Sequence, residues 1–429
     1  MKKILLFTLI LVIAGGLLFA GGSKSGSSSG KTRIEFWGHL EEPINNSFED
    51  LFQRYNARNQ EVEVYGTYFP WDDYEAKVQT SLLTGGAGAD FYEIWGGWAF
   101  DFIEAGTLTE APTALINEIL RDSYEPVTGT LKSSTDGKYY GVPVDFNNEY
   151  GGMLVDKKKF QALGIPYPQT WDDIINVARR NTVRRGDIFD VRGLDFTNED
   201  SLSHIFLSMI MSKGGQYWVN GRLNFNTPQA REALQTLVDY VVVDRITNLD
   251  SLTHAEGIES YEFLARGEAL MVTRGPWCIS NLDEEFDMHV GVDFDYVPFP
   301  FWGPTKAFPA ETGWSMCVPK NSRNGAEAWK FITFMMEREN LMQHNIRSAQ
   351  IPPRRSVAEN PAYVRQAPFM KPILDILQYA HFIGPFNTEV FKENLNQVFM
   401  SLCQRTGEFA DVTAALRALE TRTNSELKL

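Results

Sequence analysis

The sequence predicts an α/β protein with at least two domains, and three observations lead to this prediction. The chain has 429 residues, more than a single hydrophobic core usually holds. Between residues 33 and 95, strand-like alternation and helical spacing of apolar residues follow one another, as in an open α/β sheet. At residues 136–155, polar residues interrupt what would otherwise be one apolar strand. We interpret this segment as a strand that leaves one domain and enters another, with its polar middle facing a cleft.

Three short strands separated by helices begin the folded part of the sequence. Residues 33–37 and 61–65 alternate between apolar and polar side chains, and residues 90–94 form the third strand. Apolar residues from Ile44 to Tyr55 have helical spacing, and a second helix begins at Trp71. Ligands of open α/β sheets bind beyond the carboxyl ends of the strands. Aromatic residues that follow these strands are therefore candidates for ligand contact.

The middle of the chain is expected to form further helices separated by turns. Thr170-Trp-Asp-Asp173 has the pattern of a capping box, so Trp171 and both aspartates are predicted to be structural. Arg274-Gly-Pro-Trp277 is predicted to be a turn after a short strand. Residues 296–304 contain too many prolines for a central strand, and we interpret them as a passage between domains. Residues 357–429 are expected to form helices.

Composition and motif spacing disfavour several classes of function. The net charge of -15 disfavours nucleic-acid binding, which needs a basic face. The six histidines are scattered and no Cys-x-x-Cys pair occurs, so the spacing predicts no metal site. Neither a phosphate-binding loop nor a nucleophile turn is present, and no cofactor is expected. Carboxylate pairs such as Glu41/Glu42 cannot be placed across a glycosidic bond from spacing alone, so an enzyme has no positive support.

The N-terminus is expected to direct export. Residues 1–22 combine a positive start, an apolar stretch and small residues, as in a signal peptide, and residues 23–32 form a flexible tether. An uncleaved membrane anchor is the alternative, although the apolar stretch is slightly short for a membrane span. The cysteines, Cys278, Cys317 and Cys403, lie far from the cleavage region, which leaves a lipid anchor unsupported. They allow one disulfide at most.

Six tryptophans are the strongest indication of a binding cleft. Core packing explains aromatic residues on helical or alternating faces, whereas these six fall at predicted strand ends, loops or crossings. In such positions they suggest platforms for sugar faces, and we expect at least three of them to contact ligand. They are Trp37, Trp95, Trp98, Trp218, Trp277 and Trp314.

Seven short segments and one later addition span about residues 33–355 and can be compared with known families. They are Ile34–Gly38, Gly88–Trp95 with the later Glu104–Leu108, Asp136–Pro143, Pro168–Asp173, Gly267–Met271, Gly275–Trp277 and Ala328–Ile332. In this order they resemble the extracellular solute-binding proteins of bacterial ABC importers, family 1, the carbohydrate-binding group that includes maltose-binding protein. Each segment is short and degenerate, but the ordered set after a signal peptide is specific.

The resemblance implies a two-lobe periplasmic-binding-protein fold of type II with a ligand cleft between the lobes. Residues 33–144 plus 312–348 would form the N-terminal lobe, and residues 145–311 plus 349–429 the C-terminal lobe. The lobes would close over a sugar and present the closed form to membrane permease subunits. The protein would then be a monomeric, non-enzymatic receptor, exported to the periplasm or another extracytoplasmic location.

The resemblance also implies a set of ligand-binding residues distributed over both lobes and the crossings between them. In chain order these are Trp37, His39 and Glu41 after the first strand, Trp95 and Trp98 after the third, Asp145 and Asn147 at the first crossing, Trp218 in the second lobe, Trp277 in the Gly-Pro-Trp segment, Glu311 and Trp314 at the second crossing, and Arg354 past the third.

Two other functions remain open at this point. A secreted glycan-active enzyme would have the same aromatic cleft, and a receptor could instead bind a non-sugar solute such as a polyamine or glycerol phosphate. The clustered tryptophans and the shortage of arginine and lysine in the candidate loops argue against an anionic ligand.

Overall fold

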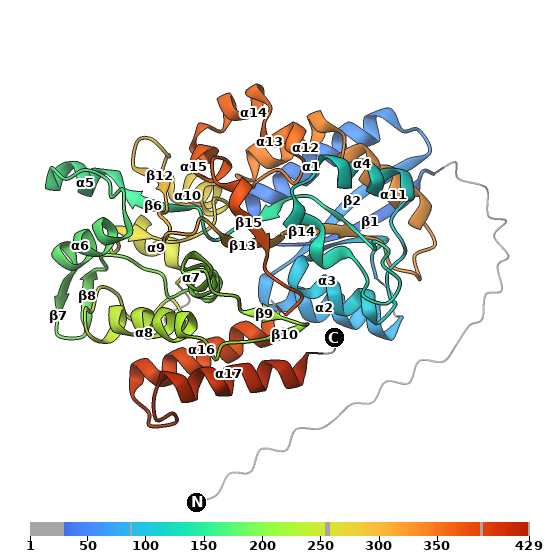
Figure 1. Ribbon diagram of the computed structural model, residues 1–429. Helices are drawn as coiled ribbons and strands as arrows, with labels where there is room; N and C mark the ends of the chain where they lie inside the picture. Colours follow the sequence, from blue (N-terminus) through green and yellow to red (C-terminus); the bar gives the residue numbers. More distant parts are fainter. Residues whose placement is uncertain (1–29, 86–87, 254–257, 387–388, 428–429) are drawn as a thin grey trace, which may run out of the picture.

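Two lobes lie side by side in the computed structural model, which describes residues 30–85, 88–253, 258–386 and 389–427 (Figure 1). The first lobe is built on a five-stranded sheet with the order β2-β1-β3-β14-β4, and the second on a three-stranded sheet with the order β11-β6-β12. The predicted signal peptide and most of the tether lie outside the described residues. Among the helices of the described ranges, none is long and apolar enough to cross a membrane.

The sheet of the first lobe begins with the parallel strands that the alternation predicts. Ile34 and Phe36 point into the core from β1, which pairs in parallel with β2 and β3. Strand β14 pairs antiparallel with β3 and with β4, because the chain enters this sheet at β14 on its return from the other lobe. The strands are β1 (Thr32–His39), β2 (Val62–Phe69), β3 (Phe91–Trp95), β4 (Val142–Pro143) and β14 (Trp314–Cys317).

Amphipathic helices cover this sheet, and α1 illustrates why they form. Its buried side chains Ile44, Phe48, Leu51 and Tyr55 recur every three or four residues, so one face packs on the sheet. Helix α2 ends at Gly85, whose φ of +63° suits glycine. The helices of the first lobe are α1 (Glu42–Arg58), α2 (Trp71–Thr84), α3 (Gly96–Glu104), α4 (Thr113–Asp122), the 3-10 helix η1 (Glu125–Leu131), α11 (Gly325–Met335) and α12 (Arg338–Arg347).

The second lobe surrounds its smaller sheet with more helices. The capping box at Thr170 is confirmed, because its side chain accepts from the Asp173 backbone while the Asp173 side chain accepts from the Thr170 backbone. The elements of this lobe are β6 (Gly152–Asp156), α5 (Lys157–Leu163), α6 (Trp171–Asn181), β7 (Val183–Arg185), β8 (Ile188–Val191), α7 (Glu199–Ser212), β9 (Trp218–Val219), β10 (Arg222–Leu223), α8 (Pro228–Val242), α9 (Ser260–Ala265), β11 (Met271–Val272), α10 (Cys278–Phe286), β12 (Phe294–Pro298), α16 (Glu389–Gln404) and α17 (Val412–Glu426).

A small sheet between the lobes carries the crossings of the chain. Asn147 of β5 pairs antiparallel with Glu311 of β13, and the Phe146 backbone N–H donates to the Ile351 carbonyl at 2.9 Å. Three separate chain segments therefore run together between the two larger sheets, at the centre of Figure 1. The strands of this sheet are β5 (Phe146–Asn147), β13 (Phe308–Thr312) and β15 (Ala380–Phe382).

The interrupted strand at residues 136–155 is confirmed as a crossing between lobes. It divides into β4 in the first sheet, β5 in the middle sheet and β6 in the second sheet. The passage expected at residues 296–304 is wrong for residues 296–298, which end β12, an edge strand of the second lobe where Pro298 disturbs no central pairing. Residues 299–307 link this strand to β13 of the middle sheet. The return to the first lobe is made instead by β13 and β14.

The C-terminal segment contains one strand, β15, in addition to the helices that the pattern predicts. This strand forms because residues 380–382 pair in parallel with β13, a contact between segments far apart in sequence. The short helices before it are α13 (Arg355–Ala358), α14 (Pro361–Gln366), η3 (Pro368–Met370), α15 (Lys371–Leu374) and η4 (Leu377–Tyr379).

Candidate functional site

A cavity of about 970 Å³ lies between the two lobes, beside the crossings. Its lining comes from the loop between β1 and α1, from the crossing strands, and from α7, α10 and α16 of the second lobe. This volume is in the range of small-molecule sites, and the combination of aromatic faces with a few polar groups is typical of them. A smaller hollow of about 480 Å³ on the second lobe alone, beside Lys159 and Arg266, has no aromatic side chain in its lining.

His39 is held between two carboxylates on the first-lobe wall. Its Nδ1 lies 2.8 Å from Glu93 Oε2, and its Nε2 lies 2.9 Å from Glu41 Oε2. Burial by itself would lower the pKa of His39, but the charges and hydrogen bonds of Glu93 and Glu41 raise that pKa to about 10. His39 is therefore an imidazolium at neutral pH, with both ring N–H groups donating to carboxylates.

A group of aromatic rings packs around this histidine. The His39 ring is stacked on Trp314, with 4.2 Å between centroids and 10° between planes. Trp71 meets Trp314 edge-on at 5.8 Å, and Trp98 packs against both of these rings. Trp71 is 49% exposed and lines the cavity, so part of its indole is open to a ligand. This wall can offer flat apolar faces that its own packing holds in place.

Asp145 forms the floor of the cavity at the first crossing. Its Oδ1 accepts from the Trp314 backbone N–H at 2.8 Å, which ties the first crossing to the second. Its Oδ2 is buried and accepts from no described residue. Burial, followed by the charge of Glu93, raises the pKa of Asp145 well above its usual range.

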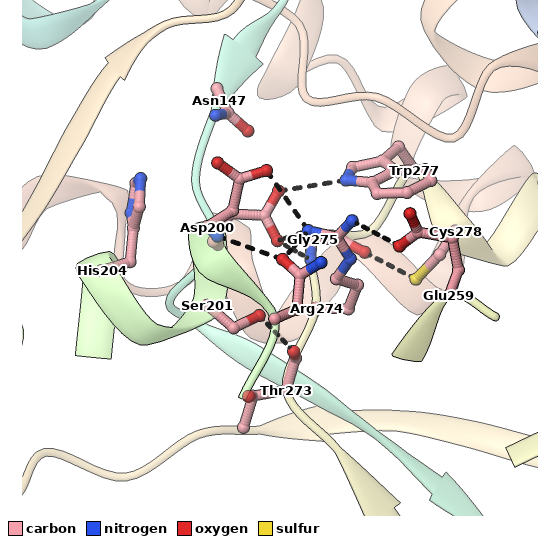
Figure 2. Close-up of polar contacts among 12 residues, drawn as sticks. Asn147, Asp200, Ser201, His204, Glu259, Thr273, Arg274, Gly275, Trp277 and Cys278 are labelled. Atoms are coloured by element: carbon pink, nitrogen blue, oxygen red, sulfur yellow. Dashed lines mark hydrogen bonds and ion pairs between the residues drawn. The ribbon is translucent and has the colours of Figure 1, made fainter. Parts of the chain in front are cut away.

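Arg274 organises the polar wall of the second lobe (Figure 2). Its Nη1 donates to Asn198 Oδ1 at 2.6 Å and lies 3.3 Å from Asp200 Oδ2, and its Nη2 donates to Glu259 Oε2 at 3.1 Å. The guanidinium also lies 4.7 Å from the centre of the Trp277 ring. These contacts join α7, the approach to α9 and the turn before α10 into one rigid surface.

Glu149 fixes the Trp277 indole on this surface. Its Oε1 accepts from Trp277 Nε1 at 3.0 Å, and its Oε2 accepts from the Gly275 backbone N–H at 2.5 Å. A Cβ on Gly275 would lie 2.7 Å from Glu149 Oε1, so a glycine is needed for this approach. Tyr261 meets Trp277 edge-on at 5.7 Å. The second lobe thus presents a fixed tryptophan to the cavity as well.

Lys392 of α16 connects the two walls. It forms an ion pair with Asp200, and its Nζ lies 4.0 Å from the centre of the Trp95 ring in the first lobe. Burial would raise the pKa of Asp200, but the positive charges of Lys392 and Arg274 lower it below its usual range. Asp200 is therefore ionised beside Lys392, and the contact of Lys392 with Trp95 joins the two lobes.

The structure brings seven of the twelve sequence-predicted site residues together in the lining of this cavity. They come from both lobes and from two crossings, which are separated by more than a hundred residues along the chain. The seven are His39, Glu41, Trp95, Asp145, Asn147, Trp277 and Trp314.

The other five predicted residues lie outside the lining, and each has partners within the protein. Trp37 donates from Nε1 to Glu35 at 3.0 Å, Trp98 is buried beside Trp71, and Trp218 stacks on Phe386. Glu311 is fully buried and accepts from Asn147 Nδ2 at 2.8 Å. Arg354 is 2% exposed because it bonds to Glu118, Asp122 and the Met336 carbonyl. Of these five, Trp98 and Glu311 contact residues of the lining, namely Trp71, Trp314 and Asn147.

Several lining residues were missed by the sequence reasoning. A signal existed for Trp71, which comes just after β2 as Trp95 comes at the end of β3, and for Glu149, which belongs to the polar patch of the crossing. Arg274 stands three residues before Trp277 and could have been included with it. For Lys392, in the middle of a helical pattern, the sequence offers no such signal.

The chemistry of the lining is that of hydrogen bonding and stacking. Within the described ranges, no group of three histidine, cysteine, aspartate or glutamate side chains is placed to hold a metal ion. The three cysteines are free. The arrangement offers carboxylate and amide acceptors between aromatic faces, which suits a small polar ligand with an apolar ring face.

The comparisons with known proteins agree with this architecture. The family model described as "Bacterial extracellular solute-binding protein" matches residues 41–342. A binding protein of Brucella abortus (strain 2308) is 23% identical over 325 residues, which are 75% of this chain and 75% of that protein.

Two solved structures have the same fold. An ABC transporter solute-binding protein from Thermotoga lettingae, bound with α-D-tagatose, is 18% identical with a TM-score of 0.76 and covers 92% of this chain and 99% of its own. Maltose-bound MalE3 from T. maritima is 19% identical with a TM-score of 0.75, over 92% of this chain and 100% of its own. At these identities the likeness establishes the two-lobe α/β fold.

Proposed function

We propose that this chain, which belongs to the bacterial extracellular solute-binding protein family, is the substrate-binding component of an ABC importer and binds a sugar or oligosaccharide between its lobes. The observation that carries the proposal is the cavity between the lobes, with Trp71 and Trp314 on one wall and Trp277 on the other. Two opposed aromatic walls with carboxylates between them suit the apolar faces and the hydroxyl groups of a sugar ring. The sugars named for the two structural neighbours above support this assignment.

The mechanism follows from the position of the crossings. An open form binds the sugar on one lobe, and movement at the crossing strands lets the other lobe complete the contacts, which shifts the population toward the closed form. Membrane permease subunits then recognise the closed form and accept the sugar. The lobes that move comprise residues 33–144 plus 312–348 and residues 145–311 plus 349–429. Asp145 and Trp314 lie where these lobes meet, so their hydrogen bond is at the hinge.

The remaining parts of the proposal concern where and how the protein acts. Residues 1–22 direct export and residues 23–32 form a tether, so the protein works outside the cytoplasm. It acts as a monomer, without catalysis and without nucleic acid, since its strongly acidic composition repels a phosphate backbone.

A thermal-shift screen against mono- and oligosaccharides tests the function. A receptor should melt at a higher temperature in the presence of its sugar, because the sugar binds the folded protein and not the unfolded chain. It should also show a change in tryptophan fluorescence and release no product. Reducing-sugar release from an oligosaccharide would instead identify a glycan-active enzyme. A shift only with glycerol phosphate or a polyamine would replace the carbohydrate assignment while leaving the receptor role.

A further inference from the structure

The charge of the cavity lining is strongly unbalanced. Eight carboxylates line the cavity, whereas two side chains with permanent positive charge, Arg274 and Lys392, do so, together with His39. The carboxylates are Glu41, Glu42, Asp145, Glu149, Glu199, Asp200, Glu259 and Glu285. The cavity as a whole is therefore a region of negative potential.

The cations of the lining are already engaged by carboxylates of the protein. Arg274 contacts Asp200 and Glu259, and Lys392 contacts Asp200. His39 lies between Glu41 and Glu93. These positive charges are directed at the protein's own acids, so they are poorly placed to bind an anionic group of a ligand.

Two carboxyl oxygens of the lining, one on the first-lobe wall and one at the first crossing, in contrast lack a donor among the described residues. Glu41 Oε1 and Asp145 Oδ2 are both buried, and neither accepts a hydrogen bond from any described residue. Asp145 is 3% exposed and lines the cavity. The charge of Glu41 is among the causes, after burial, that raise the pKa of Asp145, so the two groups act on one another. A buried carboxyl oxygen without a hydrogen-bond partner is unfavourable, and a donor supplied by the ligand would relieve it. The raised pKa of Asp145 means that burial disfavours its ionised form, and a positively charged donor would favour that form.

Acidic side chains from both lobes extend this wall. Glu42 begins α1, and Glu285 lies on α10 of the second lobe. The pKa of Glu285 is raised, first by burial and then by the charges of Glu41, Glu262, Glu42 and Glu284. Both Glu42 and Glu285 are exposed, and neither forms an ion pair with a described residue. This pair of exposed acids can attract a cation toward the buried pair.

We propose that the ligand is an amino saccharide, whose ammonium group contacts Glu41 and Asp145 while its ring lies against the indoles of Trp71 and Trp314. This inference rests on the proposed carbohydrate function and narrows its substrate class. Hydroxyl groups of a neutral sugar can donate to the same oxygens, but they leave the excess negative charge in place. An ammonium group satisfies the oxygens and neutralises the charge, and aromatic faces also favour a nearby cation.

Matched saccharides test the inference by isothermal titration of the exported protein at pH 6, where the amines are protonated. The first set is the β-1,4-linked glucosamine disaccharide, cellobiose and N,N′-diacetylchitobiose, which share a backbone and differ at carbon 2. Three further sets use monosaccharides. Each set contains one amino sugar, which is glucosamine, galactosamine or mannosamine, together with its hydroxyl and N-acetyl counterparts. We expect one amine-bearing member to bind at least about tenfold more tightly than both counterparts.

The outcomes separate this inference from the function on which it rests. If a hydroxyl or N-acetyl member binds as tightly as its amine counterpart, the amino-saccharide inference is wrong and the carbohydrate function stands. If putrescine or spermidine binds and no saccharide does, the carbohydrate function is wrong, and the amino-saccharide inference fails with it. Absence of binding by every probe contradicts both.

Variants of the acidic wall locate the ammonium group. Glu41→Gln and Asp145→Asn preserve side-chain shape and remove the acid that can be ionised beside an ammonium group. We therefore expect affinity for the amine-bearing saccharide to fall about tenfold or more, with a change of less than about threefold for its neutral counterpart. Glu285→Gln, at an exposed position that folding tolerates, should cause a smaller selective loss. Glu63→Gln on β2, a half-exposed glutamate outside the lining, is the matched control. Equal loss for both saccharides in the Glu41 and Asp145 variants would overturn the assignment.

Discussion

His39 shows how one buried side chain can support a binding surface from below. Two carboxylates hold its ring, and the ring in turn lies flat against Trp314. A charged imidazolium under an indole face combines stacking with a cation–π attraction, so the tryptophan keeps one orientation. The histidine therefore positions an aromatic face and does not itself offer a free ring nitrogen to the cavity.

The raised pKa of His39 predicts a loss of stability on the alkaline side. The unfolded chain loses this proton near its ordinary pKa of 6.5, whereas the folded protein keeps it up to a pKa of about 10. The stabilisation is therefore complete below pH 6.5 and is lost as the pH rises through about 10. Denaturant unfolding between about pH 7 and 10 should show a free energy that falls more steeply for the wild type than for His39→Gln. Parallel curves would contradict the assigned proton.

Substitution of the tryptophans that line the cavity should reduce binding far more than stability. Trp71→Ala removes a ring that is already 49% exposed, and Trp277→Ala removes the matching face of the second lobe. We expect affinity for the best saccharide of the thermal-shift screen to fall about tenfold or more in each, the loss of a good stacking contact. Trp218→Ala, outside the lining, is the matched control and should retain affinity. Unchanged affinity in Trp277→Ala would remove the second-lobe wall from the site.

The crossing strands β13 and β14 depend on one glycine between them. A Cβ on Gly313 would lie 1.5 Å from Asp145 Oδ1, the atom that accepts from the Trp314 backbone N–H. No rotation of a flexible side-chain end can relieve this contact, because Asp145 is buried between the crossings. The two crossings can therefore approach one another closely only with glycine at this position.

Gly313→Ala should accordingly damage both folding and binding. Overpacking at this position is expected to lower the free energy of unfolding by about 1–3 kcal/mol and to displace Asp145 from the floor of the cavity. Chemical denaturation measures the first effect, and saccharide titration measures the second. Gly325→Ala, in the first turn of α11 with its nearest neighbour at 3.2 Å, is the control and should be close to neutral. A fully stable Gly313→Ala protein with normal affinity would refute the close approach.

At the scale of the whole molecule, the lobes touch across the cavity as well as through the crossings. Lys392 of the second lobe lies over the Trp95 ring, and Asn46 Nδ2 on α1 lies 3.5 Å from Glu284 Oε2 on α10. Both contacts join elements of different lobes, so they exist only while the lobes are close together. Helices α16 and α10 of the second lobe therefore contact the first lobe outside the crossing strands.

Lys392→Met should weaken closure while retaining most of the side-chain length. The cation–π contact with Trp95 is lost, although Asp200 keeps Arg274 as a partner. We expect a several-fold faster ligand dissociation and a larger radius of gyration of the ligand-free protein, since a contact of about 0.5–2 kcal/mol is removed. Stopped-flow fluorescence and small-angle scattering measure these effects. Lys330→Met, an exposed lysine on α11, is the control, and indistinguishable behaviour of the two variants would exclude a role of Lys392 in closure.

Much of the local structure could be predicted from the sequence because local contacts determine it. The strand alternation at residues 33–37, the helical spacing from Ile44 to Tyr55 and the capping box at Thr170 each depend on residues within a few positions of one another. The crossing at residues 136–155 could be predicted as well, because burying a polar patch in the middle of a continuous core strand would be unfavourable. These features determine two α/β lobes and a polar crossing between them.

Only the tertiary structure decided which side chains face the cavity. Trp37 and Trp95 both follow a strand, but long-range packing on Phe69 and Tyr92 turns Trp37 away. Arg354 is buried in the first lobe because it bonds to Glu118 and Asp122, which lie more than two hundred positions earlier in the chain. The acidic wall likewise joins Glu41 to Glu285 across the lobes. Such placements depend on contacts between segments that are far apart in the sequence. The local periodicity of the chain reports only neighbouring residues, so it cannot predict these contacts.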